Sequence, residues 1–328
     1  MTKKALRLIK GYTYTLYGFV LRSEFPCPEL AVSKGKPDVV LRYGKVSEVP
    51  ADPLEEDHPT EDLSPFVLHV PGVAKYLVRD GCEVIVEPSV DSLESDIRLW
   101  LFGSTFSALL NQRGMLALHA SGIETKAGAI LFAGPSGIGK STLVTAFIQR
   151  GYRMLTDDVS GIATDESATP VVMPGIPRVK LWEDAMDRLG IETGSYRRLR
   201  PGVTKYDLPM RRDIARWPLP LCRVYVIRVR DDEASEIERL TKLAGFETML
   251  EHTHRKHFLN TVRGRDTQFR VAAAILRSVE VCNIWRSPLG IRLDELVDRL
   301  EGDFQSLSGL TTGNTHFDTA PTPGLYNG

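Results

Sequence analysis

The chain has 328 residues, of which 42% are hydrophobic and 25% charged, a composition typical of globular proteins. It carries 41 Lys and Arg residues against 42 Asp and Glu residues, for a net charge of −1. Because no overall field attracts nucleic acid or an anionic membrane, we expect neither as a partner, and any bound anion must be held locally.

The N-terminus is basic but interrupts its apolar stretch too early to form a signal core, and no window reaches the roughly 18 apolar residues that cross a bilayer. The cysteines are far apart in the sequence and form no CxxC pair, which is typical of reduced thiols rather than of a disulfide framework or a zinc site. We therefore expect a cytoplasmic protein. The four cysteines are Cys27, Cys82, Cys222 and Cys282.

The first part of the chain is predicted to be β-rich, with short apolar or alternating runs separated by Pro, Gly and Asp over residues 12–100. An acidic, Pro-containing stretch at 47–64 is predicted to be a loop. From Ser92 the apolar spacing changes to that of a helix. We place a β-rich N-terminal domain at residues 1–91.

Strand and helix patterns alternate downstream, which is typical of an α/β sheet. Strands are expected at LALHASGI, AILFAG, YRMLTDD, PLCRVYVIRV and VEVCNIWR, and helices follow at STLVTAFIQRG and near 243–260, 267–278 and 291–301. We assign the catalytic domain to residues 92–305. The Gly-, Thr- and Pro-rich segment 306–328 is predicted to be a disordered tail.

A glycine-rich motif lies between an apolar strand and a helix-compatible run. Residues 134–141, GPSGIGKS, match GxxxxGK[ST], the loop whose backbone amides cradle nucleotide phosphates. In such a loop Lys140 neutralises phosphate charge and Ser141 offers a hydroxyl to Mg²⁺. The motif predicts ATP and Mg²⁺ as cofactors, but by itself leaves open whether the nucleotide is hydrolysed, used as a donor or only sensed.

Two adjacent carboxylates, Asp157 and Asp158, end a predicted strand 16 residues after Ser141. Adjacent strand residues point to opposite sides, so the pair is predicted to divide two tasks. A kinase needs both a metal ligand and an acceptor for the hydroxyl proton. We assign the metal to Ser141 and Asp158 and keep both aspartates as catalytic candidates, so which of them is the base stays open.

His119 precedes the loop strand in LALHASGIE, where a neighbouring strand would bring it near the phosphates. A histidine beside an apolar run is also often a satisfied core residue. Cations in two predicted loops are candidates for holding the γ-phosphate or the substrate, with Arg178 and Lys205 as first choices. The other cations of these loops are Lys180, Arg197, Arg198 and Arg200.

Three histidines, at 252, 254 and 257, invite a zinc site. On a helix their spacing leaves only His254 and His257 on a common face, so we do not predict zinc there.

The stretch LHASGIETKAGAILFAGPSGIGKSTLVTAFIQRGYRMLTDDVSGI resembles the catalytic domain of HPr kinase/phosphorylase, a P-loop core related to phosphoenolpyruvate carboxykinase. The resemblance implies active-site roles for His119, Asp157, Asp158 and Lys140. It also implies that nine residues contact the nucleotide: Gly134, Pro135, Ser136, Gly137, Ile138, Gly139, Lys140, Ser141 and Thr142.

The chain departs from the bacterial HPr enzymes at Pro135 and Thr142, and PGIPRVKLW replaces their later Gly-rich signature. Its N-terminal half looks similar to HPr-kinase-like proteins of ribosomal peptide maturation, including lasso peptide precursor kinases. This resemblance implies a serine kinase acting on a peptide or protein, and such enzymes can be homo-oligomers. The alternatives are an HPr-type regulatory kinase and a non-catalytic, nucleotide-switched peptide-binding module.

Overall fold

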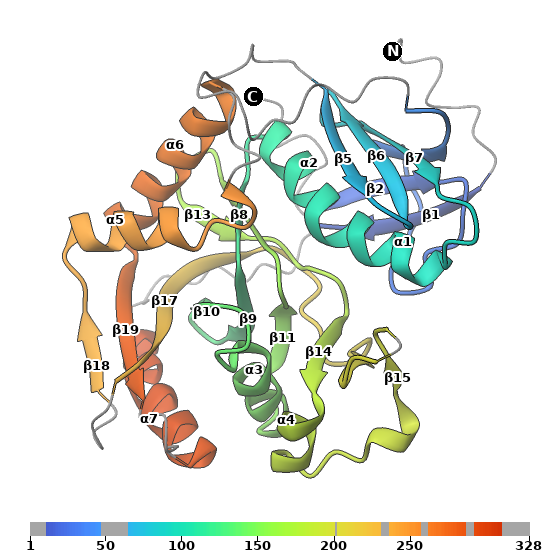
Figure 1. The fold of residues 1–328 in the computed structure, drawn as a ribbon. Helices are drawn as coiled ribbons and strands as arrows, with labels where there is room; N and C mark the ends of the chain where they lie inside the picture. Colours follow the sequence, from blue (N-terminus) through green and yellow to red (C-terminus); the bar gives the residue numbers. More distant parts are fainter. Residues whose placement is uncertain are drawn as a thin grey trace. The chain divides into compact units, whose positions relative to one another are not determined.

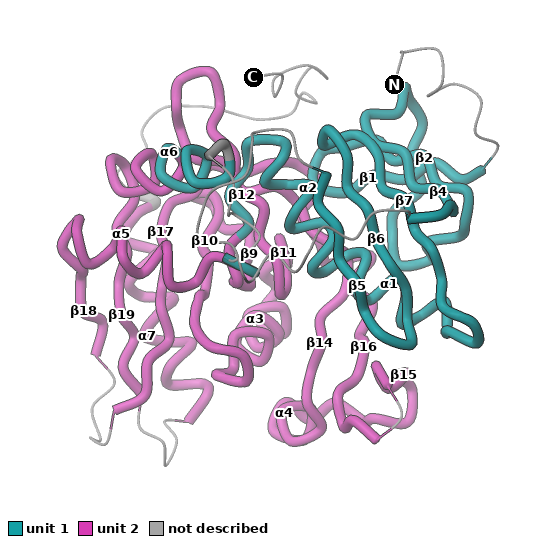
Figure 2. The backbone as a smooth tube through the Cα atoms, turned by 45° about the horizontal axis from the view of Figure 1, so that its top comes forward, with its two compact units in different colours: residues 1–117, 254–270 teal, residues 118–253, 271–328 magenta. Residues whose placement is uncertain are grey.

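The computed structural model describes residues 11–46, 65–200, 202–230, 236–256, 262–286 and 292–309. The chain forms two compact units, shown in Figure 2. Unit 1 comprises residues 1–117 and 254–270, and unit 2 comprises 118–253 and 271–328. The segment that follows the predicted first domain thus groups with the N-terminal strands. The predicted boundaries at 91/92 and 305/306 remain predictions, and both the acidic loop at 47–64 and residues 310–328 lie outside the described residues.

Unit 1 contains a mixed sheet with strand order β3-β1-β2-β4-β7-β6-β5. Its described strands are β1 Tyr12–Leu16, β2 Phe19–Ser23, β3 Ala31–Val32, β4 Val39–Tyr43, β5 Phe66–Val70, β6 Ala74–Arg79 and β7 Glu83–Pro88. The run TYTLYGFVL is a hairpin, because Tyr17 and Gly18 take positive φ angles of 51° and 78° and reverse the chain.

The helix predicted after Ser92 is present in unit 1 and has a π-helical turn in its middle. It comprises α1 Glu94–Trp100, η2 Leu101–Thr105 and α2 Phe106–Gln112. Most of its apolar residues are buried, and the Tyr76 hydroxyl on β6 donates to the Ile97 carbonyl at 2.9 Å. The amphipathic spacing in the sequence therefore predicts which face of this helical segment is buried.

Unit 2 is an α/β unit in which helices are interspersed among runs of strands along the chain (Figure 1). Strand order is β11-β9-β10-β17-β13-β12, with β19 beside β17 and β18 beside β19. Strand β17 is parallel to both β10 and β19. The strands are β9 Ala120–Thr125, β10 Gly128–Ala133, β11 Arg153–Thr156, β12 Ser160–Thr164, β13 Pro170–Val172, β17 Leu219–Val229, β18 Glu236–Arg239 and β19 Glu280–Arg286; β8, Leu116–Leu118, lies where the chain enters the unit.

A second, three-stranded sheet of unit 2 has the order β14-β16-β15, from β14 Arg178–Trp182, β16 Lys205–Pro209 and β15 Arg197–Arg198. This corrects the sequence interpretation, which placed these cations in loops: the alternation of Val and Leu with polar residues in RVKLW is the pattern of a half-buried strand.

The helices of unit 2 are α3 Lys140–Gln149, α4 Glu183–Arg188, α5 Lys242–Glu251, the second half of α6 Val262–Ser278, and α7 Leu293–Gln305, with 3₁₀ turns η3 Thr193–Ser195 and η5 Ser306–Gly309. Helix α5 ends at Glu251 rather than continuing to 260 as predicted. Within the described ranges, no helix has the length and apolarity that crossing a bilayer requires.

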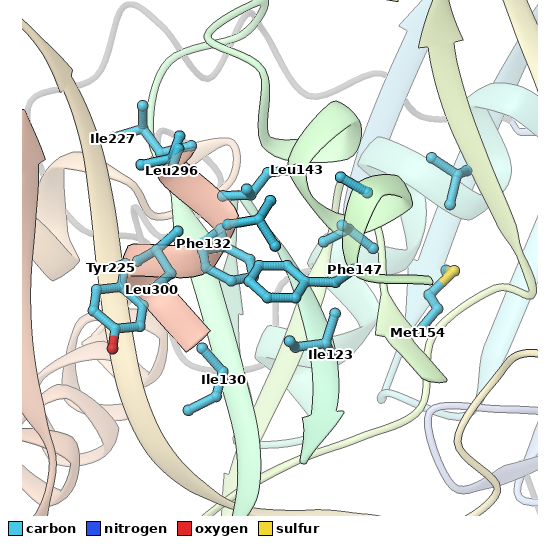
Figure 3. Packing of buried hydrophobic residues seen from close by; sticks show 14 of the residues in the cluster. Ile123, Ile130, Phe132, Leu143, Phe147, Met154, Tyr225, Ile227, Leu296 and Leu300 are labelled. Carbon is cyan, nitrogen blue, oxygen red and sulfur yellow. The ribbon is translucent and has the colours of Figure 1, made fainter. Parts of the chain in front are cut away.

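Stacked aromatic rings join the elements on either side of the glycine-rich loop (Figure 3). Phe132 on β10 lies 5.6 Å from Phe147 on α3 and 5.9 Å from Tyr225 on β17, between ring centroids. Phe147 also packs against Phe304 on α7 at 5.6 Å. All four side chains are almost fully buried. Because β10 and α3 are locked together by this core, the loop between them is held at both ends.

Candidate active site

The loop between β10 and α3 has the backbone that its glycines predict. Gly134, Gly137 and Gly139 take φ angles of 143°, 82° and 105°, which side-chain-bearing residues rarely adopt. Gly139 caps α3, whose first residue is Lys140. The strand, loop and helix predicted around GPSGIGKS are therefore confirmed. The arrangement aims the free amides of the α3 N-terminus at the loop.

Lys140 is buried at the centre of the site. Its Nζ donates to the carbonyls of Gly134 at 2.7 Å and Pro135 at 2.9 Å, and it lies 3.1 Å from Nε2 of His119. Burial lowers the pKa of Lys140 to about 8, although the two aspartates oppose the shift. The ammonium group thus sits in the concave side of the loop, where an anion would be stabilised.

The contacts of His119 define its protonation state. Nδ1 lies 2.9 Å from the carbonyl of Asp158, which can only accept, so Nδ1 carries the hydrogen and Nε2 presents its lone pair to Lys140. Burial and the neighbouring Lys140 both lower the pKa of His119. The ring is therefore neutral near pH 7. Its position beside the loop lysine confirms that the predicted histidine lies with the loop rather than in a separate core.

Asp157 is held by hydrogen bonds to both carboxylate oxygens. Its Oδ1 accepts from the hydroxyls of Ser141 at 2.7 Å and Ser121 at 2.6 Å, and its Oδ2 accepts from the backbone N–H of Lys180 at 3.0 Å. A hydroxyl and a carboxylate oxygen in contact are oxygen ligands of the kind that Mg²⁺ prefers. The pair Ser141 and Asp157 therefore fits a Mg²⁺ ion bound together with nucleotide phosphates.

Asp158 points elsewhere, with a third of its side chain exposed. Its Oδ2 accepts from Nζ of Lys180 at 2.8 Å, and its Oδ1 lies 3.5 Å from Nδ1 of His119. Its φ of 73° places it in the left-handed region, which Asp tolerates better than most residues. Strand β11 ends at Thr156, so this bend, rather than the strand alternation expected from the sequence, gives the two adjacent carboxylates different contacts.

The two cations chosen first as substrate ligands make different contacts in the structure. Arg178 is buried and pairs with Asp207 at 3.4 Å, so its guanidinium is used within the three-stranded sheet. Lys205 is half-buried, lies over the Trp182 ring at 5.4 Å, and acts electrostatically on Lys140. Both residues nevertheless belong to one sheet face.

Three residues of the site were missed or ranked too low from the sequence. Ser121 lies two residues after His119, and that spacing along a strand was the available signal. Lys180 was grouped with the loop cations. His252 was read as part of a helix, yet it follows the end of α5, its carbonyl accepts from the His119 N–H at 2.8 Å, and its side chain is 5% exposed. Nothing in the sequence links positions 119 and 252.

The zinc interpretation concerns residues near the end of α5. His257 lies outside the described residues, and His254 lies in unit 1, where Nδ1 is 2.7 Å from the Ser107 hydroxyl. Among the side chains that the structure describes, no group of three or more His, Cys, Asp or Glu residues is arranged to hold a metal ion.

Comparisons with known proteins add little. No family model matches the chain. Over 99 residues, 30% of the chain, it is 33% identical to small ribosomal subunit protein uS15 of Methanococcoides burtonii, and the match spans 60% of that protein's length. Among solved structures, the Hpr(Ser) kinase/phosphatase from Coxiella burnetii matches 59% of this chain and 93% of its own, with 14% identity and a TM-score of 0.33. Values this low carry no inference about activity, which must rest on the site itself.

Proposed function

We propose that the chain is an ATP-dependent kinase that transfers the γ-phosphoryl group to a serine hydroxyl of a peptide or protein. One observation carries the proposal: the loop lysine, a Ser141–Asp157 pair and a separate carboxylate, Asp158, converge beside a glycine-rich loop. A nucleotide site needs the first two features, and transfer to an alcohol also needs a proton acceptor.

In this proposal the nucleotide phosphates lie on the amides of residues 134–142, at the N-terminus of α3. Lys140 gives up its hydrogen bonds to the Gly134 and Pro135 carbonyls and donates to phosphate oxygens instead. Its positive charge then neutralises part of the charge on the nucleotide phosphates. Ser141 and Asp157 hold Mg²⁺, which supplies neutralisation of the charge on the phosphates. This reverses the assignment of the metal to Asp158 made from the sequence, because Asp157 is the carboxylate in contact with Ser141.

Asp158 is the proposed general base. The acceptor serine donates its proton to the Asp158 carboxylate as its oxygen forms a bond to the γ-phosphorus, and the bond between that phosphorus and the bridging oxygen breaks to release ADP. His119 binds the Asp158 carbonyl and keeps the carboxylate in place. Lys180, paired with Asp158, keeps positive charge beside the group being transferred.

The acceptor class is proposed from the sequence rather than from the site. A flexible peptide end, such as the terminal serine of a ribosomal precursor, reaches a buried donor more readily than a folded carrier does. An HPr-type acceptor is the alternative within kinases. A cytoplasmic location and a homo-oligomeric state remain proposals.

Substituting each aspartate separately tests the proposal. Asp158→Asn should retain Mg·ATP binding but lower the transfer rate by about 10² to 10⁴, the usual contribution of a general base. Asp157→Asn should weaken Mg²⁺-dependent nucleotide binding as well. Binding is measured by calorimetry and transfer by mass spectrometry of a serine peptide.

The matched control is Asp187→Asn, an exposed carboxylate on α4, which should change neither quantity. Unchanged transfer in both site variants would remove the two carboxylates from the reaction. Loss of binding in Asp158→Asn with normal binding in Asp157→Asn would reverse their proposed roles.

A further inference from the structure

The three-stranded sheet β14-β16-β15 has two chemically different faces. Its apolar face carries Val179, Leu181, Tyr206 and Leu208, all of which are buried in the hydrophobic core of unit 2. Neighbouring residues along each strand point the other way. Because the apolar face is packed into the core, the strands are held in place, and the side chains of the opposite face have a fixed arrangement.

The side chains on the opposite face, here called the cationic face, contact one another in register. Lys180 pairs across the strands with Asp207, and Asp207 in turn with Arg197; Trp182 pairs with Lys205. The contacts agree with this register, because Asp207 Oδ2 lies 3.4 Å from Arg178 and 3.6 Å from Arg197. The cationic face consists of Arg178, Lys180, Trp182, Arg197, Lys205 and Asp207.

Charge on the cationic face is unbalanced. Four cations and a single carboxylate, Asp207, lie on this face; Asp207 pairs with Arg178 and Arg197, and Lys180 pairs with Asp158 outside the sheet. Arg197 is also about half exposed, as is Trp182, which is 41% exposed and lies under the Lys205 ammonium. A row of cations with an exposed aromatic ring attracts an anionic segment and offers it apolar contact.

One end of this face belongs to the candidate active site. Lys180 reaches both aspartates, through its backbone N–H to Asp157 and through Nζ to Asp158. The cross-strand row Lys180, Asp207 and Arg197 therefore begins beside the proposed base and ends on the edge strand β15.

We infer that the cationic face is the docking surface for the acceptor, and that the acceptor is a peptide whose residues flanking the serine are acidic. This inference rests on the proposed kinase function and names its substrate class. Acidic residues bind along Lys205 and Arg197, and the serine lies at the Lys180 end, against Asp158. Arg178 is a positioning residue here, since it orients Asp207 rather than contacting the peptide.

The test compares short fluorescent peptides that carry one serine flanked by Asp and Glu, by Asn and Gln, or by Lys. Binding to the full-length protein in Mg·ADP is measured by fluorescence anisotropy at constant ionic strength. The acidic peptide should bind about tenfold more tightly than the amide peptide, the change expected from about one well-placed charge contact. Arg197→Glu and Lys205→Glu should each remove most of that preference.

Lys126→Glu is the matched control, an exposed cation in the β9–β10 turn, at the end of β10 away from the glycine-rich loop. It should leave the preference intact. Equal binding of the acidic and amide peptides, or an equal loss in Lys126→Glu, would overturn the docking surface. Charge-selective binding without phosphoryl transfer would support the docking surface and reject the kinase function. Phosphoryl transfer without a charge preference would support the kinase function and reject the docking surface.

Discussion

The Lys140 ammonium is held by two loop carbonyls and by a neutral histidine, so its charge lies in a pocket of weak acceptors. Phosphate oxygens are much stronger acceptors for an ammonium group. Burial lowers the pKa of Lys140 to about 8, and a bound anion would raise that pKa again. At this scale the motif predicted where the lysine and the serine lie, at the start of α3, because the motif is local. It missed Ser121 and His252, whose roles depend on segments that are distant in the chain.

Lys140→Ala should weaken Mg·ATP binding by about ten- to a hundredfold, as expected when a charged hydrogen bond is removed. The fold should persist, because the substitution also removes a buried charge. In the unaltered protein, affinity should fall as pH rises through about 8, where Lys140 loses its proton. Calorimetric titration across pH measures both effects, with Lys126→Ala as the control. Equal affinity of Lys140→Ala and the unaltered protein would reject the phosphate-loop assignment.

His252 predicts a loss of stability in mild acid. Burial lowers its pKa to about 4, whereas an unfolded histidine titrates near pH 6.5. Between these values the unfolded state takes up a proton that the folded state does not, so the free energy of unfolding falls as pH drops. We expect a loss of about 1–2 kcal/mol between pH 7 and pH 5, and the lowered pKa of His119 acts in the same direction.

Urea unfolding at the two pH values measures this loss. His252→Gln should reduce the difference, while His69→Gln, at an exposed histidine of β5, should leave it unchanged. The same pH dependence in His252→Gln as in the unaltered protein would show that His252 does not titrate as described.

At the scale of elements, local signals predicted the strand, loop and helix at 128–149, and amphipathic spacing predicted α1 and α2. The sequence interpretation failed at β14, where it placed the cations of PGIPRVKLW in a loop. It failed at the end of α5 because no Gly or Pro follows Glu251 to mark the stop. How β14 lies against the aspartates is set by tertiary contacts that no local pattern encodes.

Gly175 permits that approach. Its N–H donates to the Leu155 carbonyl on β11 at 2.9 Å, and a Cβ there would lie 2.6 Å from Thr156 Oγ1. Gly175→Ala should therefore destabilise the protein by about 1–3 kcal/mol through overpacking and lower phosphoryl transfer by displacing Lys180. Gly194→Ala is the control, since a Cβ at that position meets no atom within 4 Å. Equal unfolding midpoints for the two variants would show that close packing at Gly175 is unimportant.

At the scale of the whole molecule, the chain passes from one unit to the other at residues 117/118, 253/254 and 270/271. Unit 1 thus contains a segment from late in the sequence, which composition and motif spacing did not indicate. The α/β class and the β-rich N-terminal part were predictable because they follow from residue periodicity. The division into units was not, because it depends on long-range contacts.

Removing residues 1–91, the N-terminal domain expected from the sequence, would delete every described strand of unit 1's sheet but keep α1 and α2. Leu101, Phe102, Phe106 and Leu109, at most 1% exposed in the structure, would lose their packing partners. We expect the 92–328 protein to aggregate or to unfold without a cooperative transition, unlike the full chain. A soluble 92–328 protein with a sharp thermal transition would contradict the division into units.

Phosphoryl transfer to serine is the central claim, and the most direct measurement follows the phosphate itself. The full-length protein is incubated with Mg·ATP labelled in the γ-phosphate and with either an acidic peptide ending in serine or HPr, and the products are mapped by mass spectrometry. We predict labelled phosphoserine on the peptide, which should disappear in Lys140→Ala and Asp158→Asn. Absence of phosphoserine on both acceptors, in a protein that binds Mg·ATP, would contradict the account and favour a nucleotide-switched binding module.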